Sequence, residues 1–294
     1  MTNINSIGII GGDKRMLATA ESIALDGVTV FLGGFEKLDK KTNEFENMST
    51  IFETALSSEI IIFPLPLTKD GKNLNAPYAE TEIVLDDKLA KLMQGKKVFC
   101  SMKNKLISTS KYWNKELVFD YLDREELNVL NSVATAEGAL EIAMREYAGT
   151  INGSNVLVSG YGRIGKVIAH MLKGIGANVV VSARKKEDLA WVKLLGYQSV
   201  ETDKISSLKK IDIIFNTVPA MIFDSRTLAH MGQHSIVIDL SSKPGGVDFD
   251  SARRMGIKAI HALSLPGKVA PKTSGEIIKD TIFNILEEGK DWKK

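Results

Sequence analysis

Cysteine is nearly absent from this chain, since Cys100 is the only one among 294 residues. A single thiol excludes a disulfide within the chain and suits a reducing cytosol. Histidine is also scarce, with four residues at positions 170, 230, 234 and 261. Gly232 lies between two of them and favours a turn over a pair of metal ligands. We therefore expect no metal site. The sequence also shows no Ser/His/Asp or Cys/His set that would support nucleophilic catalysis.

Long apolar runs and an excess of one charge are lacking as well. The longest apolar stretch, 60–67, contains two prolines and is far shorter than the roughly 20 residues of a membrane-spanning helix. Residues 1–5 have neither a basic region nor an apolar core, so we expect no signal peptide. A net charge of +2 does not favour nucleic acid or a membrane as a partner. The composition is ordinary for a soluble globular protein, and the length suits two domains.

The stretch 156–186 carries the clearest motif of the chain. Residues 156–158 form a short apolar run typical of a buried strand, and Gly160, Gly162 and Gly165 follow it with the spacing G-x-G-x-x-G. Apolar residues then recur with the period of an amphipathic helix, at 164, 167, 168, 171, 172 and 175. Residues 178–181 predict a second buried strand. This order of strand, glycine turn, helix and strand is typical of a dinucleotide-binding unit.

Each glycine has a physical role in such a unit. The first permits a tight turn out of the strand, the second lets a pyrophosphate approach the backbone, and the third lets helix and strand pack closely. The pyrophosphate would lie on the free N–H groups at the start of the helix, beside Arg163 and Ile164. The alternative is a purely structural glycine turn, or a related fold that holds S-adenosylmethionine.

The end of the second strand indicates which dinucleotide is bound. An NAD site usually places Asp or Glu about 20 residues after the glycines, where it binds the ribose hydroxyls. This chain instead has Ser182, Arg184 and Lys185, and its first carboxylate is Glu187. A hydroxyl and an arginine suit a 2′-phosphate. We therefore predict NADP as the cofactor, with NAD as the alternative if the basic residues are only a solvated helix start.

Strand signals recur through the second half of the chain and alternate with helices. They lie at 155–159, 178–182, 211–216, 235–240 and 258–261, a pattern that predicts a parallel, doubly wound sheet. Ligands bind beyond the carboxyl ends of the strands of such sheets. The residues at those ends that we expect to line the cofactor crevice include Thr217, Val218, Pro219 and Ser241.

The first half repeats this logic, with strands expected at 6–10, 28–32, 60–63, 97–100 and 117–119. Its first turn contains Gly11 and Gly12, whose spacing is wrong for a dinucleotide, so we expect a flavodoxin-like or degenerate Rossmann-like domain. The polar loop 68–77 is of the kind that can close over a ligand. We predict a helix over 136–147 with Thr135 as its N-cap, and a loop over 266–275 before a last helix at 276–288.

We expect the last helix to return to the first domain. The predicted architecture is therefore α/β, with two parallel-sheet domains and a cleft between them. The N-terminal, flavodoxin-like or substrate domain would comprise 1–134 and 275–294, and the Rossmann domain 135–274.

Six stretches that cover both halves resemble the family of the dipicolinate synthase A-subunit. They are IGIIGGDKR (7–15), NSVATAEGALEIA (131–143), GYGRIGKVIA (160–169), NTVPAMI (216–222), IDLSSKPGGVDF (238–249) and LPGKVAPKTSGEII (265–278). The first and the last are the most specific. This resemblance implies an NAD(P)-dependent oxidoreductase that converts a dihydrodipicolinate-level compound to dipicolinate, together with the flavoprotein-like B-subunit of dipicolinate synthase. It implies action in the mother cell of a sporulating bacterium, and we also expect a homo-oligomer.

A dicarboxylate substrate needs cations and backbone N–H groups around it. The candidates for substrate contacts are Gly12, Asp13, Arg15, Thr135, Lys243 and Lys272. Arg15 could instead form an ordinary salt bridge. His261, at a strand end, suits a structural histidine better than a proton donor. No catalytic acid or base is evident.

Three functions compete at this point. The first is the dipicolinate-forming dehydrogenase. The second is another NAD(P) dehydrogenase of a small hydroxy or amino acid, which fold alone does not separate from the first. The third is a non-catalytic protein that only binds NADP for its partner, and the lack of an evident acid or base keeps it open.

Overall fold

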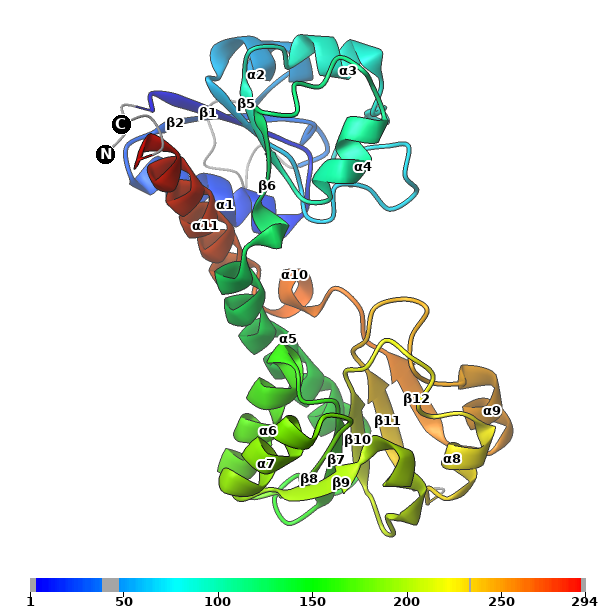
Figure 1. The fold of residues 1–294 in the computed structure, drawn as a ribbon. Helices are drawn as coiled ribbons and strands as arrows, with labels where there is room; N and C mark the ends of the chain where they lie inside the picture. The colour runs from blue at the N-terminus through cyan, green and yellow to red at the C-terminus, as the bar shows by residue number, and fades with distance from the viewer. Residues whose placement is uncertain (1–3, 39–47, 233, 292–294) are drawn as a thin grey trace. The chain divides into compact units, whose positions relative to one another are not determined.

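A computed structural model describes residues 4–38, 48–232 and 234–291. The fold is α/β with two parallel-sheet domains, as expected, and each sheet has six strands where five were predicted (Figure 1). The chain forms two compact units, 1–128 with 270–294, and 129–269. Among the described residues, no helix combines the length and apolar composition that crossing a membrane requires.

The sheet of the first unit is entirely parallel. Its strand order, β3-β2-β1-β4-β5-β6, is the Rossmann order and not the flavodoxin order. All three isoleucines of β4 are buried, because helices cover both faces of such a sheet. The short β3 had no apolar signal in the sequence. The strands are β1 (Ser6–Ile10), β2 (Thr29–Gly33), β3 (Met48–Ser49), β4 (Ile60–Ile62), β5 (Lys97–Cys100) and β6 (Val118–Asp120).

The helices of the first unit include the C-terminal one. They are α1 (Lys14–Leu25), α2 (Ile51–Ser57), α3 (Asp87–Leu92), α4 (Lys103–Ser108), the 3-10 helix η1 (Tyr121–Asp123) and α11 (Pro271–Asp291). Helix α11 lies against α1 (Figure 1). The approach is close at Gly275, where an added Cβ would lie 2.6 Å from the carbonyl oxygen of Arg15. The Thr19 hydroxyl also donates to the Gly275 carbonyl at 3.1 Å.

The second unit repeats the Rossmann order in its own parallel sheet, β12-β11-β10-β7-β8-β9. Sequence patterns missed the edge strand β9, which is polar and only partly buried. The strands are β7 (Asn155–Ser159), β8 (Asn178–Ala183), β9 (Gln198–Glu201), β10 (Ile213–Asn216), β11 (Ile236–Asp239) and β12 (Lys258–His261). The helices are α6 (Arg163–Ile175), α7 (Lys186–Leu194), η2 (Thr202–Ser207), α8 (Ser225–Ala229), α9 (Phe249–Arg254) and α10 (Leu265–Val269).

Two predicted element boundaries were wrong. Helix α5 (Glu125–Glu146) begins well before Thr135, which is therefore not an N-cap. Its hydroxyl donates to the Asn131 carbonyl at 3.0 Å, a bond that a threonine can make inside a helix. The predicted loop 266–275 is mostly helical, since α10 and the first turn of α11 occupy it. Pro271 is tolerated there because the first residue of a helix needs no N–H partner. Lys272 thus lies in a helix and not in a loop.

Candidate cofactor site

The glycine turn between β7 and α6 leaves open space at one position only. A Cβ on Gly160, whose φ is +97°, would lie 2.4 Å from the Thr217 hydroxyl oxygen. A Cβ on Gly165 would lie 2.2 Å from the Gly160 carbonyl oxygen. A Cβ on Gly162 would meet nothing within 4 Å. The first and third glycines therefore serve the turn and its packing, whereas the second leaves the backbone open to a ligand.

The start of helix α6 lies at this open position. Gly162 is its N-cap, no side chain caps it, and its first turn contains no acidic residue. The first N–H groups of a helix lack partners within the helix and carry a partial positive charge. Gly162 and the first turn, which includes Arg163, Ile164 and Gly165, therefore have the features of an anion site.

Polar residues mark the carboxyl ends of the neighbouring strands. Parallel pairing places Ser159 level with both Ser182 and Asn216, Asn216 level with Asp239, and Asp239 level with His261. The Ser182 hydroxyl lies 3.4 Å from that of Ser159, and the Asn216 amide donates to the Asp239 carboxylate at 2.8 Å. All but His261 are buried, so this row holds the loops that follow the strands in place.

Two of the three predicted residues after β10 adjoin the first glycine of the turn. The Thr217 hydroxyl donates to the Ser159 carbonyl at 2.9 Å, and the N–H of Val218 donates to the Asn216 side-chain oxygen at 3.2 Å. A Cβ on Gly160 would contact both Thr217 and Val218. Pro219 follows and is exposed. Residues 217 and 218 therefore form one wall of the glycine turn.

Buried Asp239 organises the loop after β11. Its carboxylate accepts from the Ser241 hydroxyl at 2.6 Å, the Ser241 N–H at 3.1 Å and the Gly246 N–H at 3.0 Å. Ser241, predicted as a cofactor contact, is itself buried, and its hydroxyl is used in this network. His261 donates from Nε2 to the Ser241 carbonyl at 3.0 Å and packs on the ring of Phe249. These contacts favour the structural interpretation of His261.

Among the three basic residues after β8, Arg184 alone has no ion partner within the described residues. Lys185 pairs with Glu187 at 3.2 Å and Lys186 with Glu201 at 2.7 Å. Hydrogen bonds from Lys186 and Lys204 lower the pKa of Glu201. Arg184 is exposed and lines a pocket of about 470 Å³, together with Met221, Ile222, Thr227 and Glu201 among others. The pocket belongs to the second unit alone.

The predicted substrate contacts are divided between the two units. Gly12, Asp13, Arg15 and Lys272 belong to the first unit, and Thr135 and Lys243 to the second. Arg15 is only 5% exposed. Its guanidinium donates to the Asp13 carboxylate at 3.0 and 2.8 Å, and to the Leu65 carbonyl. Arg15 therefore forms a salt bridge, which is the alternative role that the sequence left open for it.

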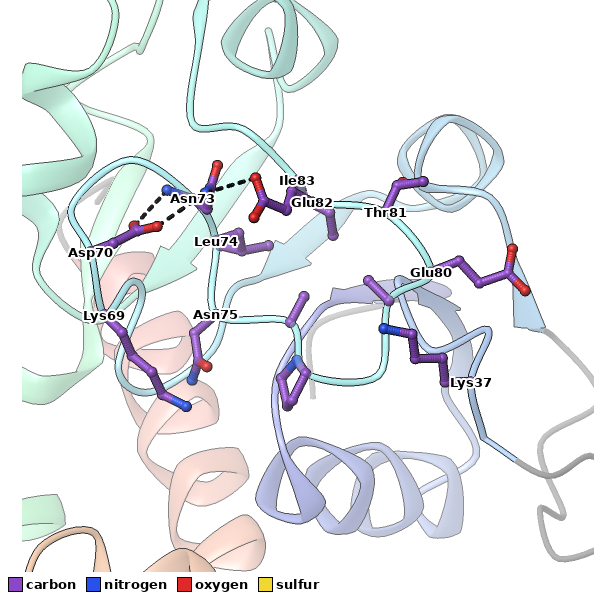
Figure 2. A pocket seen from close by; sticks show the side chains of 13 residues that line it. Lys37, Lys69, Asp70, Asn73, Leu74, Asn75, Glu80, Thr81, Glu82 and Ile83 are labelled. Atoms are coloured by element: carbon purple, nitrogen blue, oxygen red, sulfur yellow. Dashed lines mark hydrogen bonds between the residues drawn. The ribbon is translucent and has the colours of Figure 1, made fainter.

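Sequence reasoning named neither Lys69 nor Asn75, which line a pocket of the first unit (Figure 2). The only signal was that both belong to the polar loop expected to close over a ligand. Within the described ranges, no group of three His, Cys, Asp or Glu side chains could hold a metal ion.

Comparison with known proteins covers nearly the whole chain. Residues 6–116 match the family of the dipicolinate synthase A-subunit N-terminal domain, and residues 131–244 match the D-isomer specific 2-hydroxyacid dehydrogenase NAD-binding domain family. The dipicolinate synthase A-subunit of Bacillus subtilis is 33% identical over 284 residues, which are 96% of each chain. The crystal structure of the same protein from Bacillus halodurans has a TM-score of 0.83 at 31% identity, covering 96% of this chain and 97% of that one. The Bacillus subtilis structure has the same TM-score and identity, covering 98% and 97%.

Proposed function

The chain belongs to the family of the dipicolinate synthase A-subunit, and from this membership we propose that it oxidises a dihydrodipicolinate-level compound to dipicolinate (pyridine-2,6-dicarboxylate), with NADP as the hydride acceptor. Residues 131–244, nearly all in its second unit, match an NAD-binding domain family, which supports a nicotinamide cofactor. The observation that carries the cofactor assignment is the open backbone at Gly162 beside an uncapped helix start.

The residues of the second unit fit such a cofactor. Gly160, Gly162, Arg163, Ile164 and Gly165 would hold the pyrophosphate, and Thr217, Val218 and Pro219 would border it. Arg184 would bind the 2′-phosphate, because its guanidinium has no competing ion partner in the part of the chain that is described. Ser182 and Ser241 are buried, so we assign them the role of positioning the loops. Lys185, paired with Glu187, would contribute less than Arg184.

The proposed reaction requires little from the protein beyond the correct orientation of substrate and cofactor. Oxidation of a dihydropyridine removes a hydride and a proton, and bound NADP supplies the nicotinamide that accepts the hydride. Formation of the aromatic ring makes the step downhill, so correct positioning accounts for most of the catalysis. We propose that water takes the proton, because we assign no catalytic acid or base.

Two of the predicted substrate contacts have free ammonium groups. Lys243 and Lys272 are exposed, and neither has an ion partner among the residues described. We propose that each lysine binds a carboxylate of the substrate from its own unit. The hydroxyl of Thr135 is already used inside α5, which leaves it a weaker candidate.

The biological setting is also part of the proposal. The relative is named as one subunit of a synthase, and we propose that this chain likewise acts with the B-subunit of dipicolinate synthase. We place the pair in the cytoplasm of the mother cell of a sporulating bacterium, and we propose that the chain forms a homo-oligomer.

A binding titration tests the cofactor assignment. We expect NADPH to bind at least about tenfold more tightly than NADH, since hydrogen bonds to a charged group contribute about 1.5–3 kcal/mol. Arg184→Ala should abolish this preference. Lys185→Ala removes the same charge one residue away and should reduce the preference less than Arg184→Ala does, because Lys185 pairs with Glu187. Equal binding of the two nucleotides would refute the NADP assignment, and binding of neither would refute the cofactor site.

An activity assay tests the reaction. The purified chain is mixed with NADP and freshly formed dihydrodipicolinate-level substrate, with and without the B-subunit, and dipicolinate is followed by its ultraviolet absorbance. Dipicolinate formation that depends on this chain and on NADP supports the proposal. If the B-subunit reaches the same rate without this chain, the non-catalytic alternative is favoured. Turnover only of small hydroxy or amino acids would favour the other dehydrogenase.

A further inference from the structure

The first unit has a pocket at the position where its strand order reverses. Strands β1 and β4 are neighbours at the centre of the sheet, and the chain leaves them in opposite directions. Ligands of open α/β sheets bind beyond the strand ends at such a point. A pocket of about 330 Å³, within the usual range of about 300–1,000 Å³ for small molecules, is lined there mainly by the loop 69–83 (Figure 2).

Asn75 is fixed at this reversal point by its backbone. Its N–H donates to the Leu67 carbonyl at 2.8 Å, in the segment that follows β4. Its carbonyl oxygen lies 3.4 Å from where a Cβ on Gly11, directly after β1, would be. Gly11 has a φ of +70° and packs under Leu74 and Ala76, so the loop lies directly on the end of β1.

The side chain of Asn75 has no hydrogen-bond partner among the described residues, although the residue is only 8% exposed. The amide belongs to the pocket lining and stays accessible from the pocket, so a molecule there can reach it. Its NH₂ group is therefore available to a ligand.

Lys69 supplies a positive charge beside this amide. It is exposed, and its ammonium group has neither an ion pair nor a hydrogen bond in the described ranges. Figure 2 shows the side chains of Lys69 and Asn75 extending to the same side of the loop. An ammonium group and an amide NH₂ offer up to five N–H donors, and a carboxylate is acceptor-only.

The acidic residues of the pocket are directed elsewhere. The Asp70 carboxylate accepts from the N–H groups of Lys72 and Asn73, both at 2.8 Å, and from the Thr68 hydroxyl at 3.0 Å. Hydrogen bonds from the backbone N–H groups of Asn73 and Lys72 hold the pKa of Asp70 well below its ordinary value. Glu82 accepts from the Asn73 amide on the same side as Asp70, and Glu80 extends away from Lys69 and Asn75 (Figure 2).

We propose that Asn75 and Lys69 form a carboxylate-binding subsite of the first unit, which holds one carboxylate of the pyridine dicarboxylate. The subsite rests on the proposed function for the identity of its ligand. We assign the carboxylate contact to Lys69 and Asn75 and not to Arg15, because the Arg15 guanidinium is already bound to Asp13 and to the Leu65 carbonyl.

Equilibrium binding of two related acids to the full chain in the presence of NADPH tests the subsite. Dipicolinate carries two carboxylates and picolinate (pyridine-2-carboxylate) carries one. The wild-type chain should bind dipicolinate at least about tenfold more tightly than picolinate, since charged hydrogen bonds are the strong ones. Asn75→Asp and Lys69→Met should each remove most of this difference, and Lys69→Arg should keep it.

Lys72→Met is the matched control. It removes the same charge from the same loop, but Lys72 does not line the pocket, so the preference for dipicolinate should stay at the wild-type value. Affinity for NADPH and the thermal unfolding midpoint should not change in any variant. Lys69 is exposed, so its substitution tests the subsite even if Asn75→Asp impairs folding.

The outcomes separate the subsite from the proposed function. If the wild-type chain prefers dipicolinate and both variants retain that preference, the subsite is refuted and the proposed function stands. If the wild-type chain with NADPH bound takes up neither acid, the proposed function fails and the subsite fails with it. An equal loss in Lys72→Met would show that the charge of the whole loop matters, which also refutes the subsite.

Discussion

Two alanine substitutions in one glycine turn should separate folding from cofactor binding. In Gly165→Ala the new Cβ would lie 2.2 Å from the Gly160 carbonyl oxygen, where ordinary contact begins at 3.4 Å. The backbone of β7 or α6 must then move by about 1.2 Å, and overpacking of this kind costs about 1–3 kcal/mol. In Gly162→Ala the Cβ enters open space, so the free energy of unfolding should change by less than about 1 kcal/mol.

The effect on NADPH binding should be separate from the effect on stability in Gly162→Ala. The Cβ of Gly162→Ala occupies the space through which a pyrophosphate would approach the start of α6. Losing even one N–H bond to a charged group costs about 1.5–3 kcal/mol, or about ten- to hundredfold in affinity. Gly162→Ala should therefore be a stable protein that binds NADPH poorly. Gly165→Ala should lose both stability and binding.

Gly174→Ala is the control within the same helix. Gly174 is exposed, its Cβ would also meet open space, and alanine favours the helix by about 0.5–1 kcal/mol. Urea denaturation gives the free energy of unfolding, and quenching of intrinsic fluorescence gives the affinity for NADPH. If Gly162→Ala binds NADPH as tightly as Gly174→Ala does, the assignment of the open backbone to the pyrophosphate is wrong.

Three further predictions concern residues that stabilise the fold around the two proposed sites. Gly275→Ala should lower the free energy of unfolding by about 1–3 kcal/mol in urea, because α11 must move off α1, whereas Gly289→Ala in the open part of the same helix should not. Asp239→Asn places an NH₂ group among hydrogen-bond donors and should cost about 1–3 kcal/mol in the same assay. Hydrogen bonds from Arg124 lower the pKa of Glu288 below 4.5, so this pair stabilises the fold above that pH. The stability gap between wild type and Glu288→Gln should therefore vanish as the pH falls through the folded-state pKa, and a gap that instead widens in acid would contradict this.

The sequence alone was sufficient for the fold class and for the geometry of the glycine turn. Both depend on local signals: buried parallel strands are continuous apolar runs, and the roles of Gly160 and Gly165 follow from spacing. The structure adds the partner atoms, since the side chain of Thr217 closes on Gly160 from a strand more than fifty residues away.

Local sequence signals gave wrong predictions where one residue type suits two different structural roles. A threonine before an alanine-rich stretch is typical of an N-cap, yet Thr135 bonds to the carbonyl four residues earlier inside α5. Proline and glycine in 266–275 are typical of a loop. Pro271 instead begins α11, and Gly275 permits the close contact between α11 and α1. At Gly275 the deciding contact joins residues 256 positions apart, and a local sequence pattern does not contain such a contact.

The site residues show the same limit. Arg15 follows a glycine turn and was a reasonable substrate contact, but the partners of its guanidinium include the carbonyl of Leu65, fifty residues later. Asn75 had no motif to mark it. Its significance comes from its place in the fold, since it lines a pocket beside the end of β1 and its side chain has no hydrogen-bond partner in the described part of the chain.

The two units use one strand order in different ways. In the second unit the helix after the first strand begins at Gly162 with no capping side chain, so its N–H groups can meet an external anion. In the first unit the equivalent helix, α1, is capped by Asp13, whose carboxylate is also bound by Arg15. The protein's own anion thus fills the place that a phosphate would take. A ligand of the first unit must find its donors elsewhere at the strand ends, and the loop carrying Lys69 and Asn75 offers them. Under the two proposals, a nucleotide site and a carboxylate site share one strand order and differ in the side chains at the strand ends.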